Sequence, residues 1–267
     1  MLHIMLDAYR AKAEDLNDLR VVYEKINRVT NFLSVKTIMP PVLVPYYYGQ
    51  VKEDDGISAF VMLKGGHFTI HTFPERECYF VDILYDGFVN ADKFVDILAK
   101  EFPFEFKILN VVDRRFDIHD QAQFAKIDEM DDFGPHYLIK TLSPQEYTMD
   151  EMYAFLDKLP TTINMDPIFR PVVITDNVYN PKIYSGITVI AQSHIAFHYY
   201  KETKKAYIDI LSCSFINCDN LIREVQKALG TECESILISR GSKHTQKRTQ
   251  RDEYISRFNE WQENIRG

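Results

Sequence analysis

Serine, histidine and cysteine side chains recur at fixed spacings in the second half of the chain. Ser193 is followed five residues later by His198 and twenty residues later by Cys213, and Ser185 precedes it by eight residues. A hydroxyl can attack a carbonyl, an imidazole can take up a proton near neutral pH, and a thiol can return one. Each residue alone is more often structural, so the whole set has to decide the interpretation.

An internal repeat without gaps strengthens this set. At a shift of 127 positions, residues 58–92 lie over residues 185–219. The matched pairs that could do chemistry are Ser58 with Ser185, His67 with His194, His71 with His198, Glu75 with Glu202, and Asp82 with Asp209. Agreement of this density predicts a duplication, although it does not name a function.

Each half predicts the same order of elements around the repeat. Apolar residues at helical spacing indicate an early helix, and three strand-like segments follow it. The helices are expected around residues 16–26 and 152–159, and the strands at 57–63, 68–73 and 79–84 and at 187–191, 195–200 and 206–211. Asn90 and Asn217 are candidate N-caps of a second helix, and Gly230 is placed to end it.

These elements predict an α+β fold of two similar halves, each an antiparallel sheet with helices on one face, packed as an αββα sandwich. Residues 1–131 form the first repeat and residues 132–267 the second, with the boundary in the acidic stretch 117–132 and a polar C-terminal tail. The tail includes a basic cluster that we expect to be solvated: Arg240, Lys243, Lys247, Arg248 and Arg251.

Bulk composition limits the function classes. The net charge of −8 argues against a nucleic-acid partner and is compatible with a cationic substrate. No apolar run is long enough to span a membrane, the first residues lack a secretory pattern, and the four cysteines lack metal-like spacing. We therefore expect a reduced, cytoplasmic protein. His67 and His71 would lie about 13 Å apart on a strand, so the sequence predicts no metal site.

The segment 185–214 resembles the S-adenosylmethionine decarboxylase family, specifically its small bacterial and archaeal form. The family pattern is Ser-Gly, then Glu-Ser-His, with a histidine five residues and a cysteine twenty residues after that second serine. Ser185, Ser193, His198 and Cys213 fit these spacings. The first half carries HFTIHTFPE at residues 67–75, which resembles the family's His-x-x-Ile-His-Thr-Trp-Pro-Glu.

The resemblance implies a chain that cuts itself between Gln192 and Ser193. The serine hydroxyl attacks the preceding carbonyl to give an ester, and elimination leaves a pyruvoyl group, made from Ser193, at the new amino terminus. This group would be the cofactor, because its carbonyl forms a Schiff base with the substrate amine and acts as an electron sink for loss of CO₂. The substrate would be S-adenosylmethionine, and the product the aminopropyl donor for spermidine synthesis.

In the family the active site lies between two halves or two subunits, which implies one complete composite site here. Ser193 and Cys213 would combine with three residues of the first half. Of these, His71 would be the base for processing and Ser58 would help to hold the ester intermediate. Cys213 would protonate the product carbanion, and Glu75 would bind polar groups of the substrate.

The resemblance also implies that the reverse combination is inactive. Gly66 stands where a cleavage serine would be, and Asp86 stands at the cysteine position. Their partners from the second half would be Ser185, His198 and Glu202. After processing, chains 1–192 and 193–267 would stay associated, with a homodimer as an open alternative.

Two departures from the family pattern leave the substrate open. Gln192 replaces the usual glutamate before the cleavage serine, and Lys52 stands where the family stacks adenine on an aromatic ring. Substitute aromatic residues are Tyr46, Tyr47, Tyr48 and Phe133. Without one, arginine or ornithine becomes the alternative substrate. A non-catalytic member that activates a partner is the second alternative.

Overall fold

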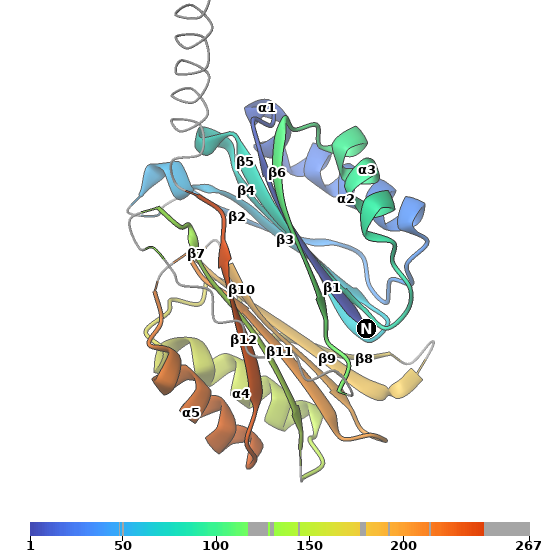
Figure 1. Cartoon of the computed structure of the whole chain (residues 1–267), viewed down its shortest axis with the longest axis vertical. Helices are drawn as coiled ribbons and strands as arrows, with labels where there is room; N and C mark the ends of the chain where they lie inside the picture. The colour runs from blue at the N-terminus through green and yellow to red at the C-terminus, as the bar shows by residue number, and fades with distance from the viewer. Residues whose placement is uncertain are drawn as a thin grey trace, which may run out of the picture.

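The computed structural model describes residues 1–47, 49, 51–116, 128, 131–143, 145–176, 180–191, 193–213 and 215–242. Within these residues, twelve strands form two six-stranded antiparallel sheets that face each other, and the longer helices cover the two outer faces (Figure 1). This is the α+β sandwich of two similar halves that the sequence predicts.

The first sheet takes its strands from the first half of the chain, in the order β2-β3-β4-β5-β1-β6. These strands are β1 Leu2–Tyr9, β2 Val42–Tyr46, β3 Gly56–Leu63, β4 Gly66–Phe73, β5 Cys78–Tyr85 and β6 Phe106–Asp113. The helical elements are α1 Ala13–Leu16, α2 Leu19–Leu33 and α3 Ala91–Glu101, with short 3₁₀ turns η1 Lys52–Asp54 and η2 Pro74–Arg76.

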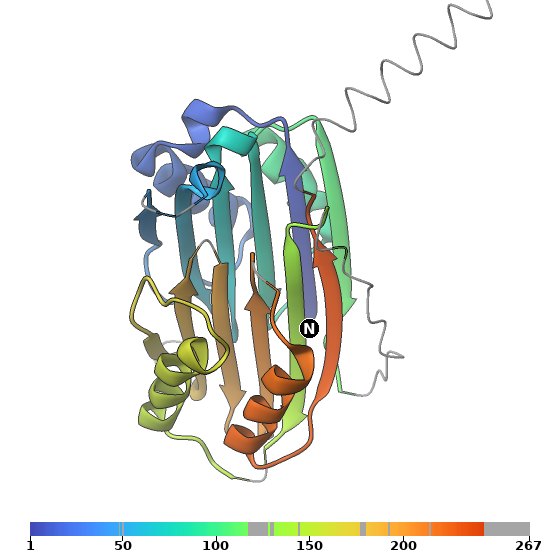
Figure 2. The same ribbon diagram turned by 90° about the vertical axis from the view of Figure 1, so that its left-hand side faces the viewer.

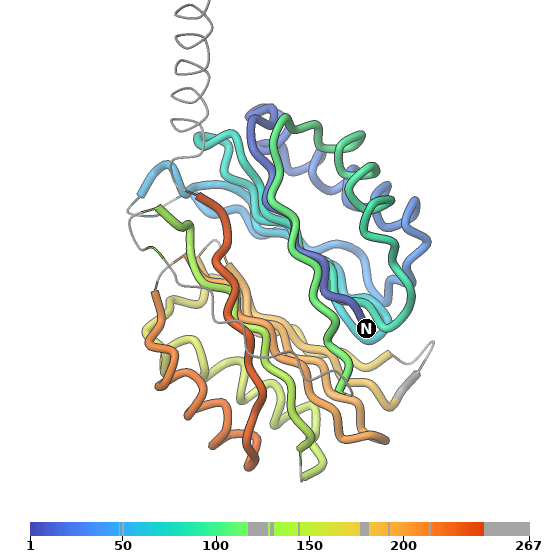
Figure 3. The backbone as a smooth tube through the Cα atoms, in the orientation of Figure 1, coloured from blue at the N-terminus to red at the C-terminus, as the bar shows by residue number. Residues whose placement is uncertain are grey.

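The second sheet repeats this order as β8-β9-β10-β11-β7-β12. Its strands are β7 Gly134–Leu142, β8 Val172–Asp176, β9 Asn180–Ile190, β10 Ser193–Tyr200, β11 Lys205–Leu211 and β12 Glu234–Arg240. Helices α4 Met149–Thr162 and α5 Cys218–Leu229 lie over its outer face (Figure 2). The smooth trace in Figure 3 shows the same path of the chain in each layer.

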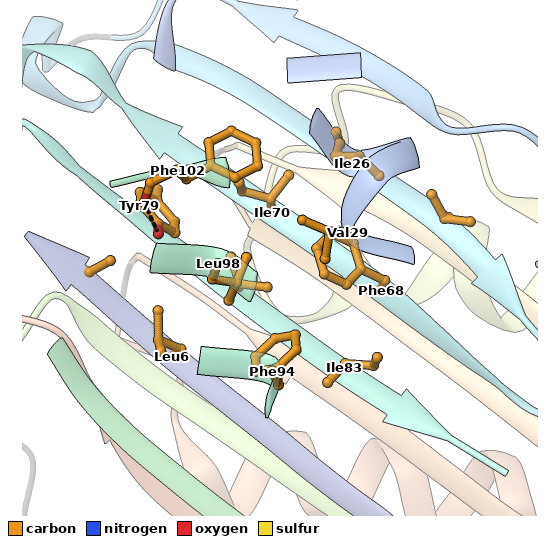
Figure 4. Packing of buried hydrophobic residues seen from close by; sticks show 14 of the residues in the cluster. Leu6, Ile26, Val29, Phe68, Ile70, Tyr79, Ile83, Phe94, Leu98 and Phe102 are labelled. Carbon is orange, nitrogen blue, oxygen red and sulfur yellow. Dashed lines mark hydrogen bonds between the residues drawn. The ribbon is translucent and has the colours of Figure 1, made fainter. Parts of the chain in front are cut away.

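Each outer layer is held by an apolar core between a sheet and its helices. In the first half, Ile26 and Val29 of α2 and Phe94 and Leu98 of α3 pack on sheet residues such as Phe68 (Figure 4). These side chains recur every three or four positions because that spacing places them on one face of a helix. The helices are thereby fixed on the faces away from the space between the sheets.

Helix ends follow the sequence expectations. The Asn90 side chain accepts a hydrogen bond from the backbone N–H of Lys93, and the Asn217 side chain does the same for Asn220. Each satisfies one of the N–H groups that a helix start leaves without a partner. Gly230 ends α5 with a φ of 65°, in the left-handed region that glycine adopts without strain.

The space between the sheets is polar at its centre. Six of the eight histidines of the chain are buried there or beside it: His3, His67, His71, His136, His194 and His198. Three buried aspartates and two buried arginines accompany them: Asp7, Asp82, Asp209, Arg114 and Arg240. Alternation along the strands explains this layer, because residues next to each other in a strand point to opposite faces of its sheet.

One sequence expectation is wrong at this layer. Arg240 was expected in a solvated basic cluster, but its side chain is fully buried. The cause is pairing, since its guanidinium donates to Asp7 at 2.8 Å and to Asp82 at 2.5 Å. The other residues of that cluster, Lys243, Lys247, Arg248 and Arg251, lie outside the described residues.

The expected division at residues 131 and 132 stays a prediction, and most of the acidic stretch before it lies outside the described residues. In the part of the chain that the structure describes, no helix is long and apolar enough to cross a membrane. All four cysteines are free thiols in this structure.

Candidate active site

Ser193 begins β10 and its side chain is fully buried. Its hydroxyl oxygen lies 3.1 Å from the Cys213 sulfur and accepts a hydrogen bond from the backbone N–H of Cys213, also at 3.1 Å. Cys213, just beyond the end of β11, is half-buried, and its thiol faces the Ala191 carbonyl at 3.8 Å. The fold therefore brings together the two residues that the sequence pairs twenty positions apart.

Ser58 and His71 form the second part of the predicted site. They are cross-strand partners on β3 and β4, and the Ser58 hydroxyl lies 2.8 Å from His71 Nδ1. The other ring nitrogen of His71 crosses to the second sheet, where its Nε2 lies 2.8 Å from Nδ1 of His194. Because His194 directly follows Ser193, this bond ties His71 to the strand that starts with Ser193.

Burial sets the protonation state of His71. Loss of hydration lowers the pKa of His71 to about 4, partly offset by the nearby carboxylate of Asp82. The imidazole is therefore neutral at pH 7 and has one nitrogen lone pair available for a proton. A neutral imidazole is the form that a general base requires.

An aromatic cluster lies at this same end of the sandwich. The Phe133 ring packs against Phe73 and Phe80 with ring centroids 4.6 Å and 4.8 Å apart. Cys213 packs against this cluster, which also contains Cys78. Since Phe73 is two residues beyond His71 on β4, the cluster places Cys213 at the His71 end of the sheet.

The candidates for stacking an adenine are less well placed. Phe133 is only 3% exposed, so a base cannot reach its face without movement of a neighbour. Lys52 lies exposed in η1. Tyr47 is 46% exposed, with its hydroxyl bonded to the Asn17 side chain at 2.8 Å. Tyr46 is half-buried at the end of β2, and Tyr48 lies outside the described residues.

The two predicted carboxylates are both exposed. Glu75 lies in η2, immediately after β4, and so at the same end as the cluster around Phe73. Glu202 lies in the turn after β10 and forms an ion pair with Lys182. Gln192, the residue before the predicted cut, lies outside the described residues.

The opposite end of the sandwich has the same histidine arrangement without a counterpart of Ser193. Ser185 Oγ lies 2.8 Å from His198 Nδ1, and His198 Nε2 lies 2.8 Å from His67 Nδ1. Gly66 precedes His67, and a Cβ atom on Gly66 would stand 1.9 Å from the Leu84 carbonyl oxygen. That position therefore lacks the hydroxyl and also the room for any side chain.

Other side chains occupy the remaining space at this end. Tyr200 is the repeat counterpart of Phe73, and its hydroxyl donates to the Gly65 carbonyl at 2.8 Å. Asp86, at the cysteine position, lies 4.0 Å from Lys64. The position that holds a thiol at the other end thus holds a carboxylate paired with a lysine here.

Comparison with known proteins gives the family of this chain. A family model described as S-adenosylmethionine decarboxylase matches residues 2–115 and 147–241, well over half of the chain. The chain belongs to the S-adenosylmethionine decarboxylase family. No curated protein matches the sequence.

Two solved structures are similar to this member of the S-adenosylmethionine decarboxylase family. One is the adenosylmethionine decarboxylase from Aquifex aeolicus VF5, at 20% identity over 45% of this chain and 92% of that one, with a TM-score of 0.38. The other is an unknown protein from Galdieria sulphuraria, at 4% identity over 89% of this chain and 96% of that one, with a TM-score of 0.21.

The buried charges between the sheets of this decarboxylase-family chain are paired across the sandwich. Arg114 donates to Asp209 at 2.5 Å, as Arg240 does to Asp82. Burial alone would raise the pKa of Asp209, but Arg114 and then His3 hold it well below its usual value. These pairs are buried on both sides, so removal of one partner would leave an uncompensated charge.

Metal-type groupings also occur in this layer. Atoms of His3, His67 and Asp209 lie within 4.8 Å of one another, as do atoms of His3, Asp82 and His136. A guanidinium can only donate, and Arg114 and Arg240 lie 3.2 Å and 2.8 Å from Nδ1 of His3 and His136. The positive charge that these carboxylates need is thus supplied by arginine. The absence of a metal site stays a prediction.

Sequence reasoning missed three contributors to this site. His194 was matched within the repeat but was given no role, and Arg114 and Arg240 were not connected with the aspartates. The available signal was the repeat itself, because Asp82 and Asp209 coincide in it and the two arginines lie at the ends of equivalent strands. Arg114 directly follows β6, and Arg240 is the last residue of β12.

Proposed function

We propose that the chain cuts itself before Ser193 and then decarboxylates S-adenosylmethionine with the pyruvoyl group formed from that serine. One observation carries the proposal. The buried Ser193 hydroxyl and the Cys213 thiol lie 3.1 Å apart at the end of the sandwich that holds Ser58 and His71. At the other end, Gly66 has no hydroxyl to react.

Processing needs only groups that the chain supplies. The Ser193 oxygen bonds to the carbonyl carbon of residue 192, the C–N bond breaks, and the nitrogen takes the hydroxyl proton to leave an ester. His71 removes the Cα proton of residue 193, and the bond between Cβ and the ester oxygen breaks, which leaves residue 192 as the carboxylate and residue 193 as dehydroalanine. Water then replaces the nitrogen, which leaves as ammonia, and residue 193 becomes a pyruvoyl group.

Three residues are proposed to support this sequence of steps. Neutral His71 has a lone pair to accept the proton. Ser58, bonded to His71 Nδ1, presents a hydroxyl close to the ester. The backbone N–H of Cys213, which donates to the Ser193 oxygen, holds that oxygen in one position before the attack.

Turnover would use the same end of the sandwich. The pyruvoyl group supplies an electron sink that makes loss of CO₂ from the bound substrate possible. Cys213 returns a proton to the carbon that lost CO₂, since its sulfur lies within hydrogen-bond distance of residue 193. Exposed Glu75 attracts the positively charged substrate, as a carboxylate at the mouth of a site does.

The two products of the cut are proposed to stay together. A cut before Ser193 would leave β10, β11 and β12 in one fragment and their partner strands β9 and β7 in the other. No hydrogen bond between the strands would be broken. β10 remains paired with β9, and both β11 and β12 remain paired with β7. Fragments 1–192 and 193–267 are thus interleaved within one sheet.

A second candidate is decarboxylation of an amino acid without a nucleoside, such as arginine or ornithine. Two observations favour it. Lys52 stands at the expected stacking position, and Phe133 is buried. A substrate panel with purified, cut protein separates the two candidates by the release of CO₂.

The decisive experiment is the intact mass of the protein under denaturing conditions, beside a Ser193→Ala variant. Two fragments, with the smaller one beginning at a pyruvoyl group in place of Ser193, support self-processing. An uncut chain in both samples rejects it and favours a non-catalytic member that binds and activates a partner.

A further inference from the structure

His71 has a second hydrogen-bond partner to which no role has been assigned. Its Nε2 lies 2.8 Å from Nδ1 of His194, and the two ring planes differ by only 9°, with centroids 5.1 Å apart. With this spacing each nitrogen points at the other ring, as a linear hydrogen bond requires. Both imidazoles are buried, so no solvent competes for the contact.

We propose that His194 is a positioning residue for His71, which it holds in one orientation and one tautomer from the position next to the cleavage serine. The proposal rests on the proposed function, because it concerns the base of that same site. His194 itself touches neither the scissile bond nor the substrate in this account.

Proton counting shows what His194 selects. A neutral imidazole has one N–H and one lone pair, so His71 can donate through only one of its two nitrogens. If His71 donates from Nε2 to His194, its lone pair lies at Nδ1 and faces the Ser58 hydroxyl. If His194 donates instead, the His71 proton lies at Nδ1 and that nitrogen cannot act as a base.

His194 can accept this hydrogen bond without losing another. Its own proton then lies on Nε2, which has no hydrogen-bond partner among the described residues. In this arrangement each hydrogen bond of the series Ser58–His71–His194 has one donor and one acceptor. A side chain without a polar atom at the Nδ1 position would leave the His71 tautomer unspecified.

The repeat provides a matched control inside the same molecule. His67 contacts His198 at 2.8 Å, with ring centroids 5.1 Å apart and planes 11° apart, and His198 contacts Ser185. His67 is also fully buried, but it follows Gly66, where there is nothing to cleave. Loss of His67 should therefore disturb packing as much as loss of His194 does, without disturbing processing.

The test compares His194→Leu, His194→Asn and His67→Leu in the full chain. We expect His194→Leu to slow self-cleavage at least tenfold, while His67→Leu changes it less than twofold at a similar loss of thermal stability. His194→Asn should restore most of the rate, because an amide places a polar atom near the Nδ1 position. Cleavage is followed by denaturing gel and intact mass.

A second readout does not depend on cleavage. In the Ser193→Ala background, ¹⁵N chemical shifts of the His71 ring report its tautomer. We expect Nδ1 of His71 to be unprotonated when His194 is present, and the two nitrogens to become mixed in His194→Leu.

The outcomes separate the two proposals. If the wild-type chain is cut but His194→Leu and His67→Leu slow the cut equally, the positioning role is wrong while the proposed function stands. A protonated Nδ1 on His71 with His194 in place also overturns it. If the wild-type chain is never cut, the proposed function fails, and the positioning role fails with it.

Discussion

Mild acid should destabilise this fold strongly, because its interior holds neutral histidines. Burial lowers the pKa of His67 and of His71 to about 4, from an ordinary value of 6.5. Below pH 6.5 these histidines bind protons in the unfolded chain but stay neutral in the folded chain. The contribution of these neutral histidines to the free energy of unfolding is therefore complete above pH 6.5, and it is lost as the pH drops towards 4.

The magnitude follows from the two pKa values. Between pH 7 and pH 5, each of these two histidines removes about 2 kcal/mol from the free energy of unfolding. Their joint effect of about 4 kcal/mol is a large part of the stability of an ordinary domain. Burial also lowers the pKa of His136, His194 and His198 well below its usual range, which adds in the same direction.

One group acts in the opposite direction. Burial raises the pKa of Asp7, although Arg240 opposes it, so protonation of this carboxyl favours the folded chain as the pH falls. A single carboxyl cannot offset five imidazoles. The net slope should keep the sign set by the histidines.

The assay is urea denaturation of the uncut Ser193→Ala chain at pH 7, 6 and 5 at constant ionic strength. The midpoint should fall with pH while the dependence on urea concentration stays constant. His67→Leu should remove about 2 kcal/mol of the fall between pH 7 and pH 5. A midpoint at pH 5 equal to that at pH 7 would refute neutral burial of the histidines.

Three further predictions concern the site. His71→Ala should slow self-cleavage far more than His198→Ala, and the reverse order on a denaturing gel would overturn the assignment of the active end. Cys213→Ala should still be cut but should lose about 10²–10⁴-fold in kcat, measured by CO₂ release; unchanged turnover would remove the thiol from the mechanism. Gly66→Ala should lower the free energy of unfolding by about 3 kcal/mol, because its Cβ would collide with the Leu84 carbonyl; an unchanged urea midpoint would contradict this collision.

The sequence predicted the layers of this fold well, because the internal repeat shows each pattern of helix and strand residues twice. Strands at 57–63 and 187–191 were recognised together, as were the two Asn caps. The strands β1 and β7 were missed, although each forms hydrogen bonds with two neighbouring strands. Each of these two strands is buried on its two faces. They therefore lack the alternation of polar and apolar residues that marks a strand with one solvent-exposed face.

The candidate site was predicted by its residues but not by its connections. The resemblance to the family grouped Ser193 with Cys213 and Ser58 with His71, and the structure has both contacts. The bond from His71 to His194 joins positions 123 residues apart on facing sheets. No local pattern encodes such a contact, because it depends on how the two sheets are stacked.

The two arginines between the sheets make symmetric contacts between the two halves of the chain. Arg114 reaches from the first half to Asp209 in the second, and Arg240 reaches from the second half to Asp82 in the first. Exchanged contacts of this kind are what a two-fold axis produces between two identical subunits. The interior of the sandwich therefore has the form of an interface between two identical subunits, enclosed within one polypeptide. The two ends of the sandwich are not identical: Ser193 stands at one end, while the other end has closed around Gly66.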